Sequence, residues 1–329
     1  MSINATQLKT ALGKAIVGSR HEVRKWPQRS SELSKYATTV TKVNGKFPTM
    51  KGFLDHVIQE FSTVWTALGN TYFEGRFLET FRQKVNYGFI PQDVYDSYIS
   101  YLASENMTPE QKPISLWILE GLREKVADDV AILEGTGTYQ AGTGAFGDSM
   151  DGIVTILNDL LTTGNPFKIP LAPLTDENIV DQMTLYERMI PRKFLSKIEH
   201  FSMSAFNKER YELRYEDQFG QKVTYKDGDT MVSRLKKKPI VGFECMDGSD
   251  FIWCTPKNNF LELKDINSPG EINDIQVLDY EVKVFMEFAL AYNFWMDEMV
   301  FISDTGGSTK GLATNHAILY PEISTTPIT

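Results

Sequence analysis

The strongest constraint on the fold of this chain is one long helical stripe between a proline and a glycine. Pro113 can open a helix, and apolar residues then recur at spacings of three and four: Leu119, Leu122, Val126, Val130 and Leu133. We expect Gly135 to end this helix, which would be roughly 32 Å long. The opposite face carries Arg123, Glu124, Asp128 and Asp129. The helix should therefore lie along a sheet with one side in water.

A glycine-rich segment, residues 135–147, follows this helix directly. It is the natural place to look for a phosphate-binding loop, but it lacks a Gly-Lys-Ser/Thr sequence and follows a helix rather than a strand. The chain has no His-Glu-x-x-His or Gly-x-Ser-x-Gly motif, and its four histidines are scattered. The sequence therefore predicts no catalytic residue, no cofactor and no metal site.

Charge is divided unevenly along the chain. Residues 1–51 carry a net charge of +8, whereas the remainder carries −17. This asymmetry indicates a basic arm on an acidic body. The candidate contact residues of the arm are Arg20, Arg24, Lys25, Arg29 and Lys35. They could meet nucleic acid or the acidic body of another copy, or the arm could be a solvated leader.

Length and hydropathy limit the remaining classes. A chain of 329 residues with 42% hydrophobic residues can form one large domain or two modest ones with ordinary cores. The start of the sequence lacks a signal-peptide pattern, and no run of 18 apolar residues occurs. We therefore expect no membrane span and synthesis in the cytoplasm.

The remaining periodicity predicts helices in the first half and strands in the second. Helices are expected over 6–17 and 51–68, from Pro91, from 153 to 161, and after Thr175. Residues 18–50 read as irregular or extended, and residues 76–90 as extended. The alternation of Tyr211, Leu213 and Tyr215 predicts a strand, and residues 280–292 predict one long strand.

A second hairpin is expected around residues 246–250, between strands at 240–245 and 251–255. Cys245 and Cys254 flank its turn. In neither plausible register do the two cysteines come close enough on one face to form a disulfide, so free thiols are expected.

The order of these features resembles a known family. Leu133-Glu134-Gly135-Thr136-Gly137 through Met150-Asp151-Gly152-Ile153 is similar to the loop after the spine helix in tailed-phage major capsid proteins of the Hong Kong 97-like fold. Residues 83–91 resemble the return of the family's extended loop, most like the branch in crAss-like and related Bacteroidota phages. Residues 183–206 and 255–260 resemble axial-domain segments. The resemblance covers roughly residues 70–300, and the order of segments is more specific than any single motif.

The resemblance implies an α+β fold with defined parts. These are an N-terminal arm (1–50), a helix and extended-loop region (51–90), a peripheral domain (91–152) with its spine helix at 114–134, a mainly axial domain (153–275), a returning peripheral strand (276–303) and a C-terminal tail (304–329). The implied extended-loop contacts are Arg76, Arg82 and Lys84. The implied structural glycines after the spine helix are Gly135, Gly137, Gly142, Gly144 and Gly152.

The resemblance further implies a structural protein, not an enzyme, that self-assembles as hexamers and pentamers into an icosahedral virion shell. Its implied partners are further copies, a portal, a separate scaffolding protein, auxiliary or decoration proteins, and double-stranded DNA held without sequence specificity. Three alternatives remain open at this stage. An encapsulin-type nanocompartment would share the fold, an enzyme would use the 135–147 loop, and a nucleic-acid-binding protein would use the arm alone.

Overall fold

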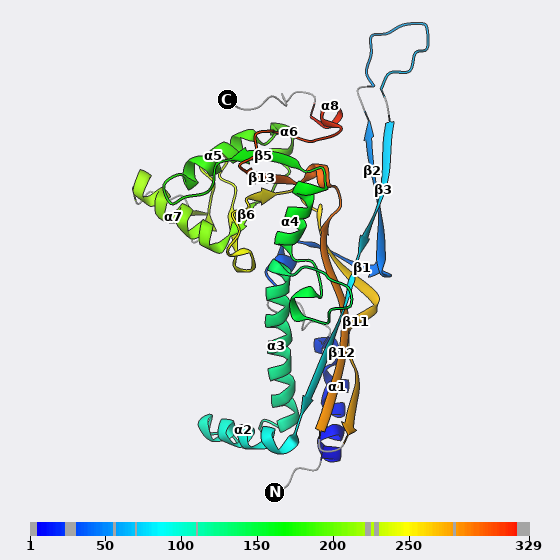
Figure 1. The fold of residues 1–329 in the computed structure, drawn as a ribbon, viewed down its shortest axis with the longest axis vertical. Helices are drawn as coiled ribbons and strands as arrows, with labels where there is room; N and C mark the ends of the chain where they lie inside the picture. The colour runs from blue at the N-terminus through cyan, green and yellow to red at the C-terminus, as the bar shows by residue number, and fades with distance from the viewer. Residues whose placement is uncertain are drawn as a thin grey trace.

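The computed structural model describes residues 5–23, 31–54, 57–69, 71–109, 111–220, 225–226, 230–278 and 281–320. These residues form two lobes and a long hairpin that projects beyond them (Figure 1). The first lobe combines a long helix with a four-stranded sheet, and the second is built on a five-stranded sheet. Separate large clusters of buried apolar side chains centre on the two lobes.

In the first lobe, helix α3 (Ile114–Thr136) packs on the sheet through the predicted stripe, all of whose members are buried. The sheet has the strand order β1, β11, β12, β4, with β1 parallel to β11 and the other neighbours antiparallel. The strands are β1 (Thr38–Val43), β11 (Phe260–Leu278), β12 (Glu281–Phe294) and β4 (Phe81–Phe89). The long strand expected at 280–292 is thus confirmed as β12, whose even-numbered residues from Val282 to Phe294 are buried.

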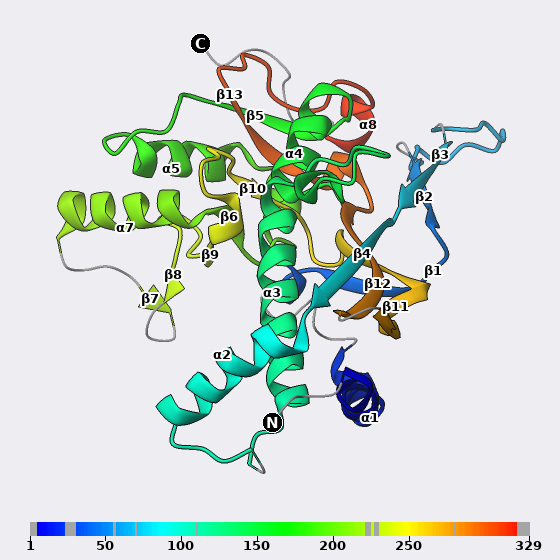
Figure 2. The ribbon, with the colours of Figure 1, turned by 60° about the horizontal axis from the view of Figure 1, so that its bottom comes forward.

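Helix α1 (Ala5–Val23) belongs to the same core. Leu8, Leu12 and Ile16 are buried with residues of α3 and β12, and Figure 2 shows α1 beside β11 and β12. The helix expected at 6–17 is confirmed, but it continues to Val23, so the expectation of irregular structure from residue 18 is wrong there. The arm is therefore partly anchored on its own chain.

Two further helices lie at opposite ends of α3 (Figure 1). Helix α2 (Pro91–Ser104) begins at Pro91 as predicted, and α4 (Ile153–Thr162) follows the glycine loop. The predicted stop at Gly135 is wrong, because α3 continues to Thr136 and the Gly137 amide bonds the Leu133 carbonyl at 3.1 Å. Gly135 lies inside the helix at the point where α3 meets the backbone of Cys245. Glycine is required there by close packing rather than by helix termination.

The second lobe has the strand order β5, β13, β10, β6, β9. Its strands are β5 (Phe167–Leu171), β13 (Phe301–Thr305), β10 (Trp253–Cys254), β6 (Phe201–Ser204) and β9 (Ile240–Phe243). Helices α5 (Ile179–Met189), α6 (Arg192–Leu195) and α7 (Ala205–Phe219) pack around it, with α8 (His316–Leu319) near the end of the chain and a short ribbon of β7 (Tyr225–Lys226) and β8 (Thr230–Met231). Thr175 assists the start of α5, since its hydroxyl accepts the Asn178 amide at 3.3 Å.

Two strand predictions in this lobe are wrong. Tyr211 and Tyr215 lie in helix α7, whose first turn is capped by the Ser204 hydroxyl accepting the Asn207 amide at 3.2 Å. The ring centroids of the two tyrosines lie 5.9 Å apart, because residues four apart are neighbours on a helix. This helical contact outweighs the alternation of two residues that predicts a strand. The hairpin at 246–250 is also wrong, because β6 lies between β9 and β10. Cys245 and Cys254 are free thiols.

The helix expected at 51–68 is also wrong. Its first residues belong to β2 (Lys46–Leu54), which pairs antiparallel with β3 (Thr71–Glu79) in the projecting hairpin. Residues 57–69 between them form no helix. The apolar spacing there does not reflect packing within the chain, because those side chains are exposed. The expectation of extended structure at 76–90 is confirmed by β3 and β4.

The close approach at Gly135 predicts a large cost for a methyl group. We expect Gly135→Ala to lower the free energy of unfolding by at least about 2 kcal/mol, because its Cβ would overlap the carbonyl oxygen of Cys245. Gly121→Ala, on the open side of the same helix, should instead stabilise by about 0.5–1 kcal/mol. Urea denaturation of both variants measures the difference, and equal effects would show that the approach is not tight.

Candidate functional site

The hairpin ends in an apolar surface that no described residue covers. We define the apolar tip as Val57, Ile58, Phe61, Val64, Trp65 and Leu68. The exposed fractions of Ile58, Phe61 and Trp65 are 91%, 90% and 87%. In Figure 1 the tip lies beyond the ends of β2 and β3, away from both lobes. Contiguous exposed apolar side chains of this kind mark an interaction surface.

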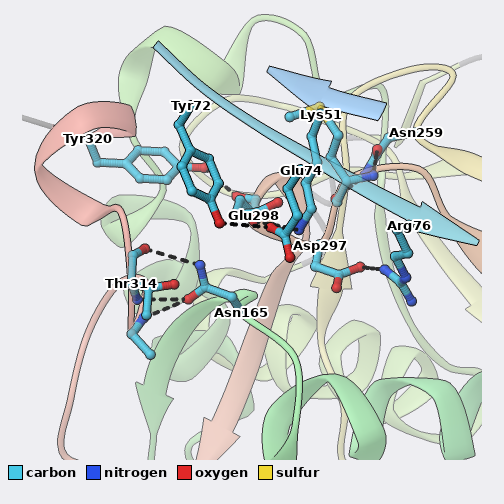
Figure 3. A network of polar contacts seen from close by, with 12 residues as sticks. Lys51, Tyr72, Glu74, Arg76, Asn165, Asn259, Asp297, Glu298, Thr314 and Tyr320 are labelled. Atoms are coloured by element: carbon cyan, nitrogen blue, oxygen red, sulfur yellow. Dashed lines mark hydrogen bonds and ion pairs between the residues drawn. The ribbon is translucent and has the colours of Figure 1, made fainter. Parts of the chain in front are cut away.

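A buried ionic network anchors the middle of the two hairpin strands (Figure 3). The Lys51 ammonium of β2 contacts the Glu298 carboxylate at 2.8 Å and the Glu74 carboxylate at 3.3 Å. Lys51 is only 7% exposed and Glu298 is buried. Arg76 of β3 pairs with Asp297. Since Asp297 and Glu298 lie between β12 and β13, this network ties the hairpin to the segment that joins the two lobes.

The predicted extended-loop residues take three different positions. Arg76 lies in this network, where it also donates to the Asn293 amide oxygen at 3.3 Å. Arg82 of β4 pairs with Glu287 of β12 across the sheet. Lys84 of β4 is exposed and lies directly opposite Glu287 in the pairing of β4 with β12. Arg76 and Arg82 are therefore engaged within the chain, and a contact with a neighbouring copy stays a prediction for all three.

The predicted arm residues are only partly placed. Arg20 lies in α1 and Lys35 is exposed in the short helix Leu33–Lys35. Arg24, Lys25 and Arg29 lie outside the described residues.

Two buried glutamates bind residues 31–39, which we call the strap. Glu134 at the end of α3 accepts the Ser31 hydroxyl at 2.9 Å and the Tyr292 hydroxyl at 2.7 Å. Glu262 of β11 accepts the Ser34 hydroxyl at 3.0 Å and the Thr39 hydroxyl at 2.8 Å. Burial raises the pKa of Glu134 to about 7, against the opposing effect of the two hydroxyls and with a smaller contribution from Glu262. The strap is therefore fastened by carboxylates, one of which titrates near neutrality.

Sequence reasoning missed Lys51, Glu134 and Glu262. A signal existed for Glu134, which lies four residues after Val130 and so continues the apolar stripe of the helix. Lys51 was counted only as arm charge. Glu262 could not be found because β11 was not predicted.

The glycine loop is closed on itself rather than open to a phosphate. The amides of Thr138, Gln140 and Gly152 donate to the carbonyls of Gly147, Asp148 and Gly137 at 2.9–3.0 Å. The Tyr139 amide donates to the Asp151 carboxylate at 2.7 Å. These donors are thus already used. A cavity of about 710 Å³ lies between this loop, β4 and α3, with an apolar floor that includes Val126 and Phe288.

The predicted glycines support this loop in two ways. A Cβ at Gly137 or Gly152 would overlap neighbouring backbone, as at Gly135, whereas Gly142 and Gly144 have positive φ angles of 84° and 68°.

Neither a metal cluster nor a membrane-spanning helix occurs in the described part of the chain. Among its residues, no group of three or more His, Cys, Asp or Glu side chains could hold a metal ion. None of its helices has the length and hydropathy needed to span a bilayer.

Comparison by sequence finds nothing: no protein-family model and no curated protein matches this chain. Solved structures do match. A chain of the satellite phage P4 procapsid with its size determination protein has a TM-score of 0.55 and 12% identity, covering 87% of this chain and 90% of that chain. A chain of the cyanophage A-1(L) capsid has a TM-score of 0.53 and 11% identity, covering 84% and 92%. The SrpI encapsulin from Synechococcus elongatus PCC 7942 has a TM-score of 0.49 and 9% identity, covering 83% and 86%.

The two phage matches define the class of fold. It is an α+β capsid-protein fold, and more particularly the Hong Kong 97-like fold that the sequence resemblance implied. The fold prediction is confirmed, whereas the assignment to one branch of phages stays a prediction.

The ionic network midway along the hairpin predicts unequal effects for two lysines of β2. We expect Lys51→Met to lower the free energy of unfolding by about 3–5 kcal/mol, because it leaves the buried Glu298 carboxylate without its cation. Lys46→Met is the control, since Lys46 pairs with Glu79 at the surface and should cost less than about 1 kcal/mol. Urea denaturation measures both, and similar losses would contradict the buried anchor.

The raised pKa of Glu134 predicts that stability falls as pH rises. Below about pH 4.5 the carboxyl is protonated in both states; between about 4.5 and 7 the unfolded chain ionises first while the folded chain keeps its proton. The free energy of unfolding should thus fall by on the order of 3 kcal/mol between about pH 4.5 and pH 7. Urea denaturation from pH 4.5 to 8 should show this loss in wild type and Glu124→Gln but not in Glu134→Gln. An unchanged slope in Glu134→Gln would refute the assignment.

Proposed function

We propose that this chain is the major capsid protein of a tailed bacteriophage, whose copies self-assemble as hexamers and pentamers into an icosahedral shell around double-stranded DNA. Its role is structural rather than catalytic. The observation that carries the proposal is the Hong Kong 97-like fold combined with a hairpin whose apolar tip one copy leaves uncovered.

The apolar tip supports assembly because its exposure is costly in an isolated chain. Burial of one large apolar side chain contributes roughly 1.5–3 kcal/mol. Ile58, Phe61 and Trp65 are nearly fully exposed, so covering them with a second copy is strongly favourable. A contact repeated by every copy in a shell multiplies this gain. The hairpin is then the extended loop that reaches over a neighbour.

The two lobes supply the remaining parts of the proposal. The lobe built on α3 and β12 serves as the peripheral domain, with α3 as its spine helix. The lobe with the five-stranded sheet serves as the axial domain around five- and six-fold centres. The basic arm and the acidic body attract each other between copies, which favours assembly and makes it sensitive to salt.

The finer identity and the partners belong to the same proposal. Residues 83–91 support a place in the branch of crAss-like and related Bacteroidota phages. The partners of such a shell are a portal, a separate scaffolding protein and auxiliary or decoration proteins. The protein is made in the host cytoplasm and resides in the virion capsid.

Light scattering of the purified recombinant protein at low and high salt, followed by negative-stain microscopy, tests this function. We expect shells, tubes or rings of five or six copies at low salt, and fewer of them at high salt. The triple variant Ile58→Ser, Phe61→Ser, Trp65→Ser should reduce assembly at least tenfold, because the tip no longer gains from burial.

The matched control is Ile99→Ser, Leu116→Ser, Ile132→Ser, which alters exposed apolar residues of the first lobe and should still assemble. A protein that stays monomeric at every salt concentration, even with a scaffolding protein, would overturn the proposal. The contents of the shells separate the alternatives: DNA supports a phage capsid, whereas one co-purifying enzyme would indicate an encapsulin. A monomer whose melting temperature rises with a small ligand would indicate an enzyme.

A further inference from the structure

The second lobe carries a concentrated basic surface within the acidic part of the chain. We define it as the exposed or half-exposed residues Arg188, Arg192, Lys193, Lys197, Arg234, Lys236, Lys237 and Lys238. Within the described part of the chain, none of these side chains forms an ion pair. Leu235, in the middle of the second segment, is 45% exposed. The surface is therefore cationic with an apolar centre.

Buried contacts hold the two segments of this surface together. The Glu187 carboxylate accepts the amides of Leu235 and Lys236 at 3.1 and 2.7 Å and the Ser233 hydroxyl at 3.0 Å. The Lys238 ammonium donates to the Ile198 carbonyl at 2.8 Å. Glu187 is buried, so its carboxylate positions the turn at 233–238 and does not pair with the exposed cations of the surface. Lys238 is thus engaged within the copy, whereas Lys236, on the turn that Glu187 holds, is left for a partner.

Helix α7 carries the opposite character on its outer face. Phe206 and Leu213 are 57% and 60% exposed, and Glu209 and Glu216 are exposed between and beyond them. The cations of α7 have partners within the same copy. Lys208 pairs with Glu212, Arg210 pairs with Asp176 and lies 5.3 Å from the Phe206 ring, and the Arg214 guanidinium donates to the Glu177 carbonyl at 3.2 Å. We call Phe206, Glu209, Leu213 and Glu216 the acidic face of α7. Figures 1 and 2 show α7 at the outer end of the second lobe, away from α3.

The acidic face lies on the side of α7 that points away from the buried Tyr211. With 100° per residue, the four residues of the acidic face point about 140–220° away from Tyr211. Tyr211 is buried, and burial raises its pKa, with smaller effects from Tyr215, Glu187 and Arg234 nearby. The Arg234 guanidinium lies 4.6 Å from the ring of Phe219, which by the same count points about 80° from Tyr211 and about 60° from Glu216. In one copy, no described side chain of the basic surface forms an ion pair with Glu209 or Glu216.

We infer that the acidic face of α7 docks on the basic surface of a second copy of this chain, in a head-to-tail contact between second lobes. The inference rests on the proposed function, because a heterologous contact closes into a ring when the rotation between copies divides a full turn, as in a pentamer or hexamer. Charge complementarity selects the partner: glutamates meet lysines and arginines, while Phe206 and Leu213 meet the apolar patch at Leu235. Exposed charges are screened over about 8 Å at physiological salt, so the contact weakens as salt rises.

A charge-swap experiment tests this contact. Arg192→Glu with Lys236→Glu, and separately Glu209→Lys with Glu216→Lys, should each lower the yield of shells or rings at least tenfold at low salt, because like charges then face each other. The quadruple variant restores opposite charges and should return the yield to within about threefold of wild type. Asp96→Lys with Glu105→Lys is the control for the glutamate double variant, since it changes the net charge by the same amount at exposed residues, one in α2 and one at its C-cap.

Circular dichroism and melting temperature confirm that each variant folds, and only folded variants are compared. Wild-type yields in both double variants would overturn the docking while leaving the shell function intact. Failure of the quadruple variant to recover would show that the two surfaces meet different partners. Unchanged yield with less nucleic acid in the Arg192→Glu, Lys236→Glu shells would assign the basic surface to nucleic acid instead. Absence of assembly in wild type itself would refute the proposed function rather than this contact.

Discussion

The packing of α3 on the buried face of β12 is the contact on which the rest of the molecule depends. One apolar stripe on the helix meets an alternating row of side chains on the strand, and α1 closes the same core. Because this pair is long and straight, it separates the second lobe from the far end of the first and leaves the hairpin projecting beyond both. The arrangement gives a thin, extended chain with large surfaces, and those surfaces need partners to be covered.

The sequence predicted the elements whose periodicity reflects contacts within the chain. The stripe from Leu119 to Leu133 and the alternation in β12 were read correctly because each buries one face on its own core. The helix over 51–68 was predicted wrongly because the apolar side chains from Val57 to Leu68 are exposed, whereas Phe53 is buried from the strand β2. Tyr211 to Tyr215 satisfied both a period of two and a spacing of four, and only the Ser204 cap and the tyrosine packing decide between them. The hairpin at 246–250 failed because β6, distant in sequence, inserts between its strands.

The candidate site was less accessible to sequence reasoning than the fold. Basic residues of the arm were singled out by charge, and Arg76, Arg82 and Lys84 by the family resemblance, yet Arg76 and Arg82 have partners in the chain. Lys51 could not be recognised as an anchor, because its partner Glu298 lies 247 positions away. Glu134 interrupts a core stripe with a carboxylate, and such a residue is informative when the stripe itself is secure. Charge totals predict attraction between copies, but only the folded lobe shows which charges remain without a partner.

The network at Lys51, Arg76, Asp297 and Glu298 has a mechanical consequence. The hairpin can act as a lever arm that pivots at the junction between the lobes. At this junction the Tyr320 hydroxyl also donates a hydrogen bond to the Glu298 carbonyl at 2.6 Å. A sideways force at the tip would therefore act with a longer arm on this junction, and it would be transmitted to β12 and β13 together. A neighbouring copy that binds the tip would thus bias the angle between the two lobes of the copy that carries the hairpin.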